Sequence, residues 1–151
     1  MYLDRFNQMS KAQPVVNTGS TPSTDIIDLS VNRDIGGAVT DNLFLLCEVV
    51  TAFTSGGSAT LRVQYQTAPD SSGVPGAWST IAQSDDIAVA SLVQGYKFLQ
   101  GLQPSGQSGS PARFVRMNYV VGTAAMTAGN ITAGLTPSLQ HQPVYPAGYV
   151  A

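Results

Sequence analysis

Residues 60–67 read TLRVQYQT, and their side chains alternate between apolar and polar. The apolar positions are Leu61, Val63 and Tyr65, and a polar side chain follows each of them. In an extended chain successive side chains point to opposite faces, so this stretch predicts a strand with one buried face and one solvated face.

Apolar segments of similar length recur along the chain, separated by Gly, Pro, Ser and Asp. They cover residues 26–29, 43–53, 60–67, 78–83, 87–90, 96–102, 113–121 and 130–139. β-branched and aromatic residues dominate most of them, which favours strands. The stretch TSGGSA at 54–59 predicts a hairpin turn, because glycine readily adopts positive φ. The pattern predicts an all-β, jelly-roll-like, two-sheet antiparallel sandwich of about eight strands, with a small barrel as the alternative.

The two ends of the chain differ in composition from the middle. Residues 1–24 end in the Ser/Thr/Gly/Pro stretch TGSTPST, and residues 137–151 contain Pro143 and Pro146. Prolines and such polar stretches oppose regular structure. We therefore expect an N-terminal arm (1–24), a β-sandwich domain (25–136) and a C-terminal arm (137–151).

The N-terminal arm carries four apolar side chains, Tyr2, Leu3, Phe6 and Met9. Spacings of three and four place Tyr2, Phe6 and Met9 on one side of a short helix, which Pro14 would end. So short a helix is marginal in water, because nucleation costs more than its few hydrogen bonds return. The stripe therefore predicts docking on another surface, either of this subunit or of a neighbour.

Two further apolar sets lack an obvious place in the core. In segment 43–53 the residues Phe44, Leu46 and Val50 share the face opposite to Leu45 and Cys47, although only one face of a sandwich strand meets the core. A bulge or a covering loop would explain them, and so would a subunit contact or the N-terminal arm. In the C-terminal arm, Tyr145 and Tyr149 are suited to lying on another subunit, because an extended Pro-rich chain loses little entropy on docking.

Charge is scarce in this chain: Lys, Arg, Asp and Glu make up 11% of its 151 residues, and the formal net charge is -2. Nucleic-acid binding needs a basic stripe, and the seven Lys and Arg residues are scattered, so we expect no direct nucleic-acid partner. A low charge content fits either a neutral polar surface or a surface occupied by neighbouring subunits. We expect no secretion signal and no membrane span, since the first long apolar run, from Leu43, is short and includes Glu48.

Residue types that carry chemistry are few. The single histidine, His141, lies in the C-terminal arm, and the single cysteine, Cys47, lies in an apolar run where an inert buried thiol is expected. One Cys and one His exclude a zinc site, and no calcium-binding run is present. We therefore expect no catalytic residues, no metal and no cofactor, and a hydrolase with an unusual site is only a distant option.

Several stretches resemble a known family. The opening MYLDRFNQMSKAQ (1–13), followed by DIIDLSVNRDIG (25–36), resembles the start of the jelly-roll capsid cement (decoration) proteins of tailed double-stranded DNA bacteriophages. The stretches VVTAFTSGGSATLRVQYQT (49–67), IAQSDDIAVASLVQGYKF (81–98) and RFVRMNYVVGTAAMTAGNITAGL (113–135) look like that family's successive strands. The likeness covers most of residues 1–136 and rests on general pattern.

This resemblance implies a non-enzymatic virion protein, made in the host cytoplasm, that sits on the outer capsid surface. It would clamp neighbouring major capsid subunits, stabilise the head and associate as a homo-oligomer, with a dimer favoured over a trimer. The expected partner contacts are Tyr2, Leu3, Phe6, Met9, Phe44, Leu46, Val50, Tyr145 and Tyr149. The alternative is a carbohydrate-binding, lectin-like β-sandwich on a virion, in which Trp78 beside a Gly/Pro loop would stack on a sugar.

Overall fold

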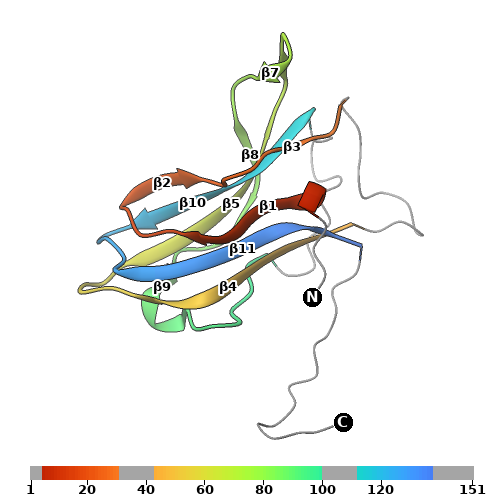
Figure 1. Cartoon of the computed structure of the whole chain (residues 1–151). Coiled ribbons are helices and arrows are strands. Elements are labelled where there is room, and N and C mark those ends of the chain that lie inside the picture. Colours follow the sequence, from red (N-terminus) through yellow and green to blue (C-terminus); the bar gives the residue numbers. More distant parts are fainter. Residues whose placement is uncertain (1–4, 31–42, 100–111, 138–151) are drawn as a thin grey trace, which may run out of the picture.

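The computed structural model of the chain describes residues 5–30, 43–99 and 112–137. Two antiparallel sheets face each other across a common core (Figure 1). The first sheet has the order β1 (Gln8–Pro14), β11 (Ala128–Thr136) and β4 (Phe44–Thr54). The second has the order β2 (Gly19–Pro22), β10 (Phe114–Gly122), β5 (Thr60–Ala68) and β8 (Ser79–Gln83).

Shorter elements extend this framework. The second sheet is lengthened by β3 (Ile27–Asp28), which pairs with β10, and by β9 (Ile87–Ala88), which pairs with β5. A small hairpin of β6 (Asp70–Ser71) and β7 (Val74–Pro75) projects from the body between β5 and β8 (Figure 1). Within the described ranges, the helical elements are two 3-10 turns, η1 (Arg5–Asn7) and η2 (Val89–Ser91).

The topology is that of a jelly roll. Along the chain, β1 lies in the first sheet, β2 in the second, β4 in the first and β5 in the second. The chain then crosses again from β10 in the second sheet to β11 in the first. The segment after η2 adds a fourth member beside β4, because Gly95 N donates to Val49 O at 2.8 Å and Phe98 N donates to Cys47 O at 2.9 Å. Two sheets of four strand positions, connected in this way, are the double-sheet arrangement of a jelly roll. The predicted all-β, two-sheet antiparallel sandwich is confirmed.

The alternating strands build the core as their sequences predict. Leu61, Val63 and Tyr65 of β5 are fully buried. The buried positions of the other strands are Leu45, Cys47 and Val49 in β4, Val115, Met117, Tyr119 and Val121 in β10, and Ile131, Ala133 and Leu135 in β11. Burying a large aliphatic side chain contributes about 1.5–3 kcal/mol, so this cluster supplies most of the driving force for folding.

The predicted N-terminal arm of residues 1–24 is wrong over residues 8–22. β1 pairs with β11, and β2 pairs with β10, so both strands belong to the body. The predicted helix is also absent from the described part of this region, where the three-residue turn η1 leads directly into β1. The reason is the irregularity of β1: it carries two register shifts, and Ala12 has a φ of 45°. Such bulges remove the strict alternation by which a strand is recognised in a sequence.

A polar link joins β1 to the second sheet. Ser10 Oγ donates to Gln13 Oε1 at 2.7 Å, and Gln13 Nε2 donates to Pro22 O at 2.9 Å. Ser10 Oγ also lies 2.7 Å from the hydroxyl of Tyr119 in β10. A hydroxyl carries one hydrogen, so with the Ser10 hydrogen directed to Gln13 the Tyr119 hydroxyl is the donor. These bonds hold the edge strand β1 across the opening between the two sheets.

The two fully buried tyrosines provide a matched test of this link. Tyr119 donates to Ser10, whereas the hydroxyl of Tyr65 finds no hydrogen-bond partner among the described residues. We expect Tyr119→Phe to lower the free energy of unfolding by about 1–2 kcal/mol, and Tyr65→Phe to raise it by about 1 kcal/mol, because an unsatisfied buried hydroxyl is removed. Urea unfolding of both variants measures this difference, and equal losses in the two would contradict it.

Candidate binding surface

In the described part of the chain, the single thiol and two of the tyrosine hydroxyls are buried and unreactive. Burial raises the pKa of the Cys47 thiol, so the thiolate nucleophile is not formed at neutral pH. Burial also raises the pKa of Tyr65 and of Tyr119, and both hydroxyls stay protonated. Within residues 5–30, 43–99 and 112–137, no group of three His, Cys, Asp or Glu side chains could hold a metal ion. His141 lies outside these residues.

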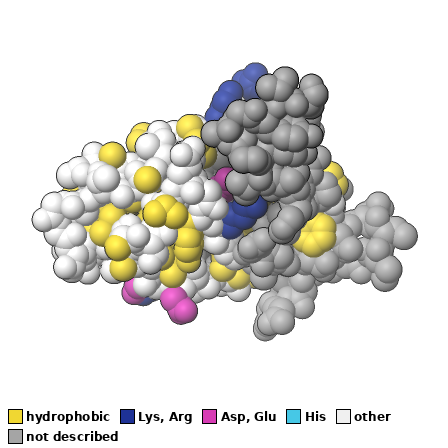
Figure 2. Space-filling model, turned by 90° about the horizontal axis from the view of Figure 1, so that it is seen from below, with side chains coloured by type: hydrophobic (Ala, Val, Ile, Leu, Met, Phe, Trp, Pro, Cys, Tyr) yellow, Lys and Arg dark blue, Asp and Glu magenta, His cyan; other side chains and the backbone are white. Residues whose placement is uncertain are grey.

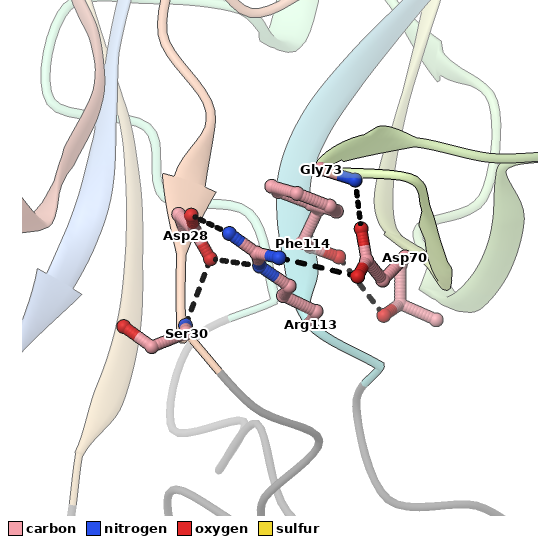
Figure 3. A network of polar contacts seen from close by, with 7 residues as sticks. Asp28, Ser30, Asp70, Gly73, Arg113 and Phe114 are labelled. Carbon is pink, nitrogen blue, oxygen red and sulfur yellow. Dashed lines mark hydrogen bonds and ion pairs between the residues drawn. The ribbon is translucent and has the colours of Figure 1, made fainter.

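The strongest charge cluster joins three elements at one end of the sandwich. Arg113 makes a bidentate pair with Asp28 at the end of β3, at 2.8 and 2.9 Å, and its third nitrogen lies 3.2 Å from Asp70 of the β6–β7 hairpin (Figure 3). Each carboxylate is also occupied by a backbone N–H, that of Ser30 on Asp28 and that of Gly73 on Asp70. With their oxygens already bonded, these groups fasten the hairpin to the body, and we assign them a structural role.

The Asp28–Arg113 pair predicts a pH dependence. The hydrogen bond from Arg113, helped by the Ser30 N–H, lowers the pKa of Asp28 from its usual 3.8 to about 2. Because the pKa is lower in the folded state, ionised Asp28 stabilises the fold above about pH 4, and this contribution is lost as the pH falls toward about 2. The urea midpoint of the native protein should therefore exceed that of Asp28→Asn at pH 5, and the two should converge near pH 2. A difference that stays constant over this range would contradict the assignment.

Trp78, the residue of the carbohydrate-binding alternative, is already engaged. The guanidinium carbon of Arg116 lies 4.0 Å from the centre of the Trp78 ring, and Arg116 Nε donates to Gln66 Oε1 at 3.0 Å. A cation held over one ring face closes that face to a stacking sugar. The neighbouring polar side chains bond to each other in the same way, since Asn118 Nδ2 donates to Gln64 Oε1 at 2.8 Å. This outer face of the second sheet is thus a largely self-satisfied polar surface.

The structure separates the predicted contact residues into different environments. Phe6 is 87% exposed and Val50 is 38% exposed, whereas Phe44 is half-buried. Met9 and Leu46 are buried, so the prediction that they contact a partner is wrong. Tyr2, Leu3, Tyr145 and Tyr149 lie outside the described residues.

The two corrections have a common reason, which is that the chain covers these side chains itself. Met9 belongs to the core cluster between the sheets. Leu46 stands on the outer face of β4 opposite Gly134, and Gly134 is buried as well, so this part of the outer face is not open to solvent. Among Phe44, Leu46 and Val50, which were predicted to share the second face of β4, only Val50 is exposed.

The face formed by β4 and the segment after β9 carries apolar side chains and few charges in its described part (Figure 2). Val50 lies on β4, and Val93, which is 57% exposed, lies on the neighbouring segment. Both are single medium-sized side chains. Scattered apolar residues of this kind are normal on protein surfaces, and by themselves they do not identify a site.

A groove of about 900 Å³ lies beside β1. Its lining residues are Arg5 and Phe6 from η1, Gln8 and Lys11 from β1, Asp25 and Ile26 from the segment before β3, and Thr132 from β11. The chain brings these elements together through backbone contacts: Asp25 N donates to Met9 O at 2.9 Å, and Ala12 N donates to Thr132 Oγ1 at 3.0 Å. The groove therefore forms where the chain crosses the edge of the first sheet on its way to β3.

The groove brings together two features, which are cations without an ion pair and exposed apolar side chains. Its cations, Arg5 and Lys11, have no carboxylate partner among the described residues, whereas Arg62 is paired with Asp86 at 2.6 Å and Arg113 is paired as above. Its apolar members are Phe6 and Ile26, and Ile26 is 45% exposed. Sequence reasoning found Phe6 but missed Ile26, because it treated residues 26–29 as one apolar segment without separating their two faces. Alternation alone could have found it, because Ile27 and Leu29 point inward.

The chain matches a known protein family. Residues 9–135, which include every strand but the first residue of β1 and the last residue of β11, match the family model Bbp16. No curated protein matches the chain. In the described part of the chain, no helix has the length and apolar character needed to cross a membrane.

Proposed function

The chain belongs to the Bbp16 family, and for this member we propose a non-enzymatic structural role on the outside of a bacteriophage capsid. In this role it clamps neighbouring major capsid subunits and stabilises the head, and it acts as a homo-oligomer. The observation that carries the proposal is the contrast between interior and surface. Among the described residues, the Cys47 thiol and the Tyr65 hydroxyl are buried and protonated, whereas two cations without an ion pair and two exposed apolar side chains line one groove.

The body has the properties that a clamp requires. Its strands are paired over most of their length. β5 and β10 pair without a register shift, from Thr60 opposite Gly122 to Ala68 opposite Phe114. Polar links and ion pairs fasten the edge strand β1 and the projecting hairpin to this body. A preorganised surface loses little conformational entropy on binding, so more of the contact energy is retained as affinity.

The surface chemistry also supports the proposal. With 11% charged residues, the chain has few groups whose desolvation would oppose a protein contact. The likeness of most of residues 1–136 to phage cement proteins supports the same class of partner. Many weakly bound copies on one shell would together stabilise it by more than any single contact could.

Imaging of purified particles tests this function. Particles from a phage that carries the gene should show additional density on the outer surface, and shells of a deletion strain should lack it. Adding the purified protein back should restore the density and raise the temperature at which the shells release DNA. Restored density without a change in release temperature would contradict the stabilising role. If the protein is found only inside the particle, or binds glycans on an array but not shells, the proposal is wrong.

A further inference from the structure

We propose that the groove lined by Arg5, Phe6, Lys11 and Ile26 is the capsid-docking site, and that it binds an extended segment of the major capsid subunit that carries both acidic and apolar side chains. The inference rests on the proposed function and names the surface that performs it. It combines three observations: the charge of the groove, its apolar side chains and the character of the adjacent sheet edge.

The charge of the groove selects the sign of its partner. Arg5 and Lys11 face one carboxylate, Asp25, so the lining carries a net positive charge although the chain as a whole is negative. Neither cation has an ion-pair partner in the described part of the chain. A carboxylate placed between them gains attraction without breaking an existing ion pair, and charge complementarity of this kind favours an acidic partner.

The apolar side chains of the groove indicate that its partner carries apolar as well as acidic side chains. Phe6 is the most exposed large apolar side chain in the described residues, and Ile26, which is 45% exposed, also lines the groove. An aromatic side chain that becomes buried at an interface is a frequent source of binding energy. Apolar side chains of the partner that packed against these two residues would remove them from water. A purely anionic ligand, such as a nucleic acid backbone, would leave them exposed.

A second copy of this chain is a poor occupant of the groove. Two copies related by a two-fold axis would bring the same cations of both grooves toward each other, and like charges in contact are unfavourable. Strand addition at the adjacent edge is also opposed, because β1 carries Lys11, a bulge at Ala12 and Pro14, which are features that block edge-to-edge pairing. A segment that lies in the groove through its side chains meets neither obstacle.

Binding of the purified protein to capsid shells that lack it tests the site. The charge variant is Arg5→Gln with Lys11→Gln, and its control is Asn17→Asp with Gln94→Glu, which changes net charge equally at exposed positions outside the groove. The apolar variant is Phe6→Ser with Ile26→Ser, and its control is Val74→Ser with Val93→Ser, at two other exposed apolar positions. We expect each groove variant to bind about tenfold more weakly, and each control to stay within about twofold of the native protein.

Two further measurements complete the test. Raising the salt concentration should weaken shell binding of the native protein more than that of the charge variant, because salt screens ion pairs that only the native protein can form with the capsid. A zero-length carbodiimide cross-linker should join Lys11 to an Asp or Glu of the capsid subunit, and mass spectrometry identifies the segment. If native protein binds shells but all four variants bind equally well, the groove is not the site while the proposed function stands. If the native protein fails to bind shells, the proposed function itself is wrong.

Discussion

Replacement of Gly129 by alanine is expected to lower the free energy of unfolding by about 3–5 kcal/mol, the largest effect that we expect for a glycine-to-alanine change among the described residues. Gly129 lies in β11 with a φ of 142°, a conformation that residues with a Cβ rarely adopt. A Cβ built there would overlap the ring of Phe53, which is buried in the core. The backbone would be strained, and the ring would have to leave a close-packed site.

Gly56→Ala is the matched control for this substitution. Gly56 lies in the turn between β4 and β5, and a Cβ there would have no neighbour within 4 Å. We expect its urea midpoint to stay close to that of the native protein. Since a domain of this kind is stabilised by about 5–15 kcal/mol, Gly129→Ala should unfold at a much lower urea concentration. Similar midpoints for the two variants would show that the β11 backbone tolerates a side chain at this position.

The second large effect is expected for Met9→Ala. Met9 is fully buried in the cluster between the sheets, so its truncation leaves a cavity that a close-packed core fills poorly. Substitutions of this type lower the free energy of unfolding by about 2–5 kcal/mol. For a chain of this length, a loss of about 3 kcal/mol corresponds to a fall in Tm of roughly 6–12 °C.

Phe6→Ala, three residues earlier, is the comparison that separates stability from binding. Phe6 is largely exposed, and we expect its Tm to change little while shell binding weakens. Calorimetry and shell binding of both variants would show whether these neighbouring apolar residues have the two separate roles. If Met9→Ala kept its Tm but lost shell binding, Met9 would be a contact residue, as the sequence pattern first indicated.

The regular strands could be predicted from the sequence because their environment on each face is uniform. In β5, Leu61, Val63 and Tyr65 point into the core and Arg62 and Gln64 point outward, so the alternation of residues 61–65 is enough to predict the strand and its buried face. β10 follows the same rule, with Met117 inward and Arg116 outward. β1 could not be recognised, because its bulges place Met9 and Ser10 in the interior together, and no periodic pattern describes that arrangement.

The candidate site was only partly predictable for a related reason. Phe6 stands out in the sequence as an apolar residue in a polar region, and its exposure agrees with that reading. Arg5 and Lys11 look like ordinary surface charges until the fold shows that they share a groove and have no ion-pair partner among the described residues. Ile26 points outward and Ile27 points inward, and which of the two is exposed depends on where the chain crosses between the two sheets.

The sequence by itself determined the class of the fold and the character of the core, because side-chain alternation and β propensity act locally along each strand. It also determined that chemistry-bearing residues are scarce. Only the tertiary structure decided that residues 8–14 and 19–22 are strands of the body, that Met9 and Leu46 are buried, and that a groove forms beside β1. The physical reason is that these features depend on contacts between residues far apart in the chain, such as Asp25 with Met9 and Ala12 with Thr132.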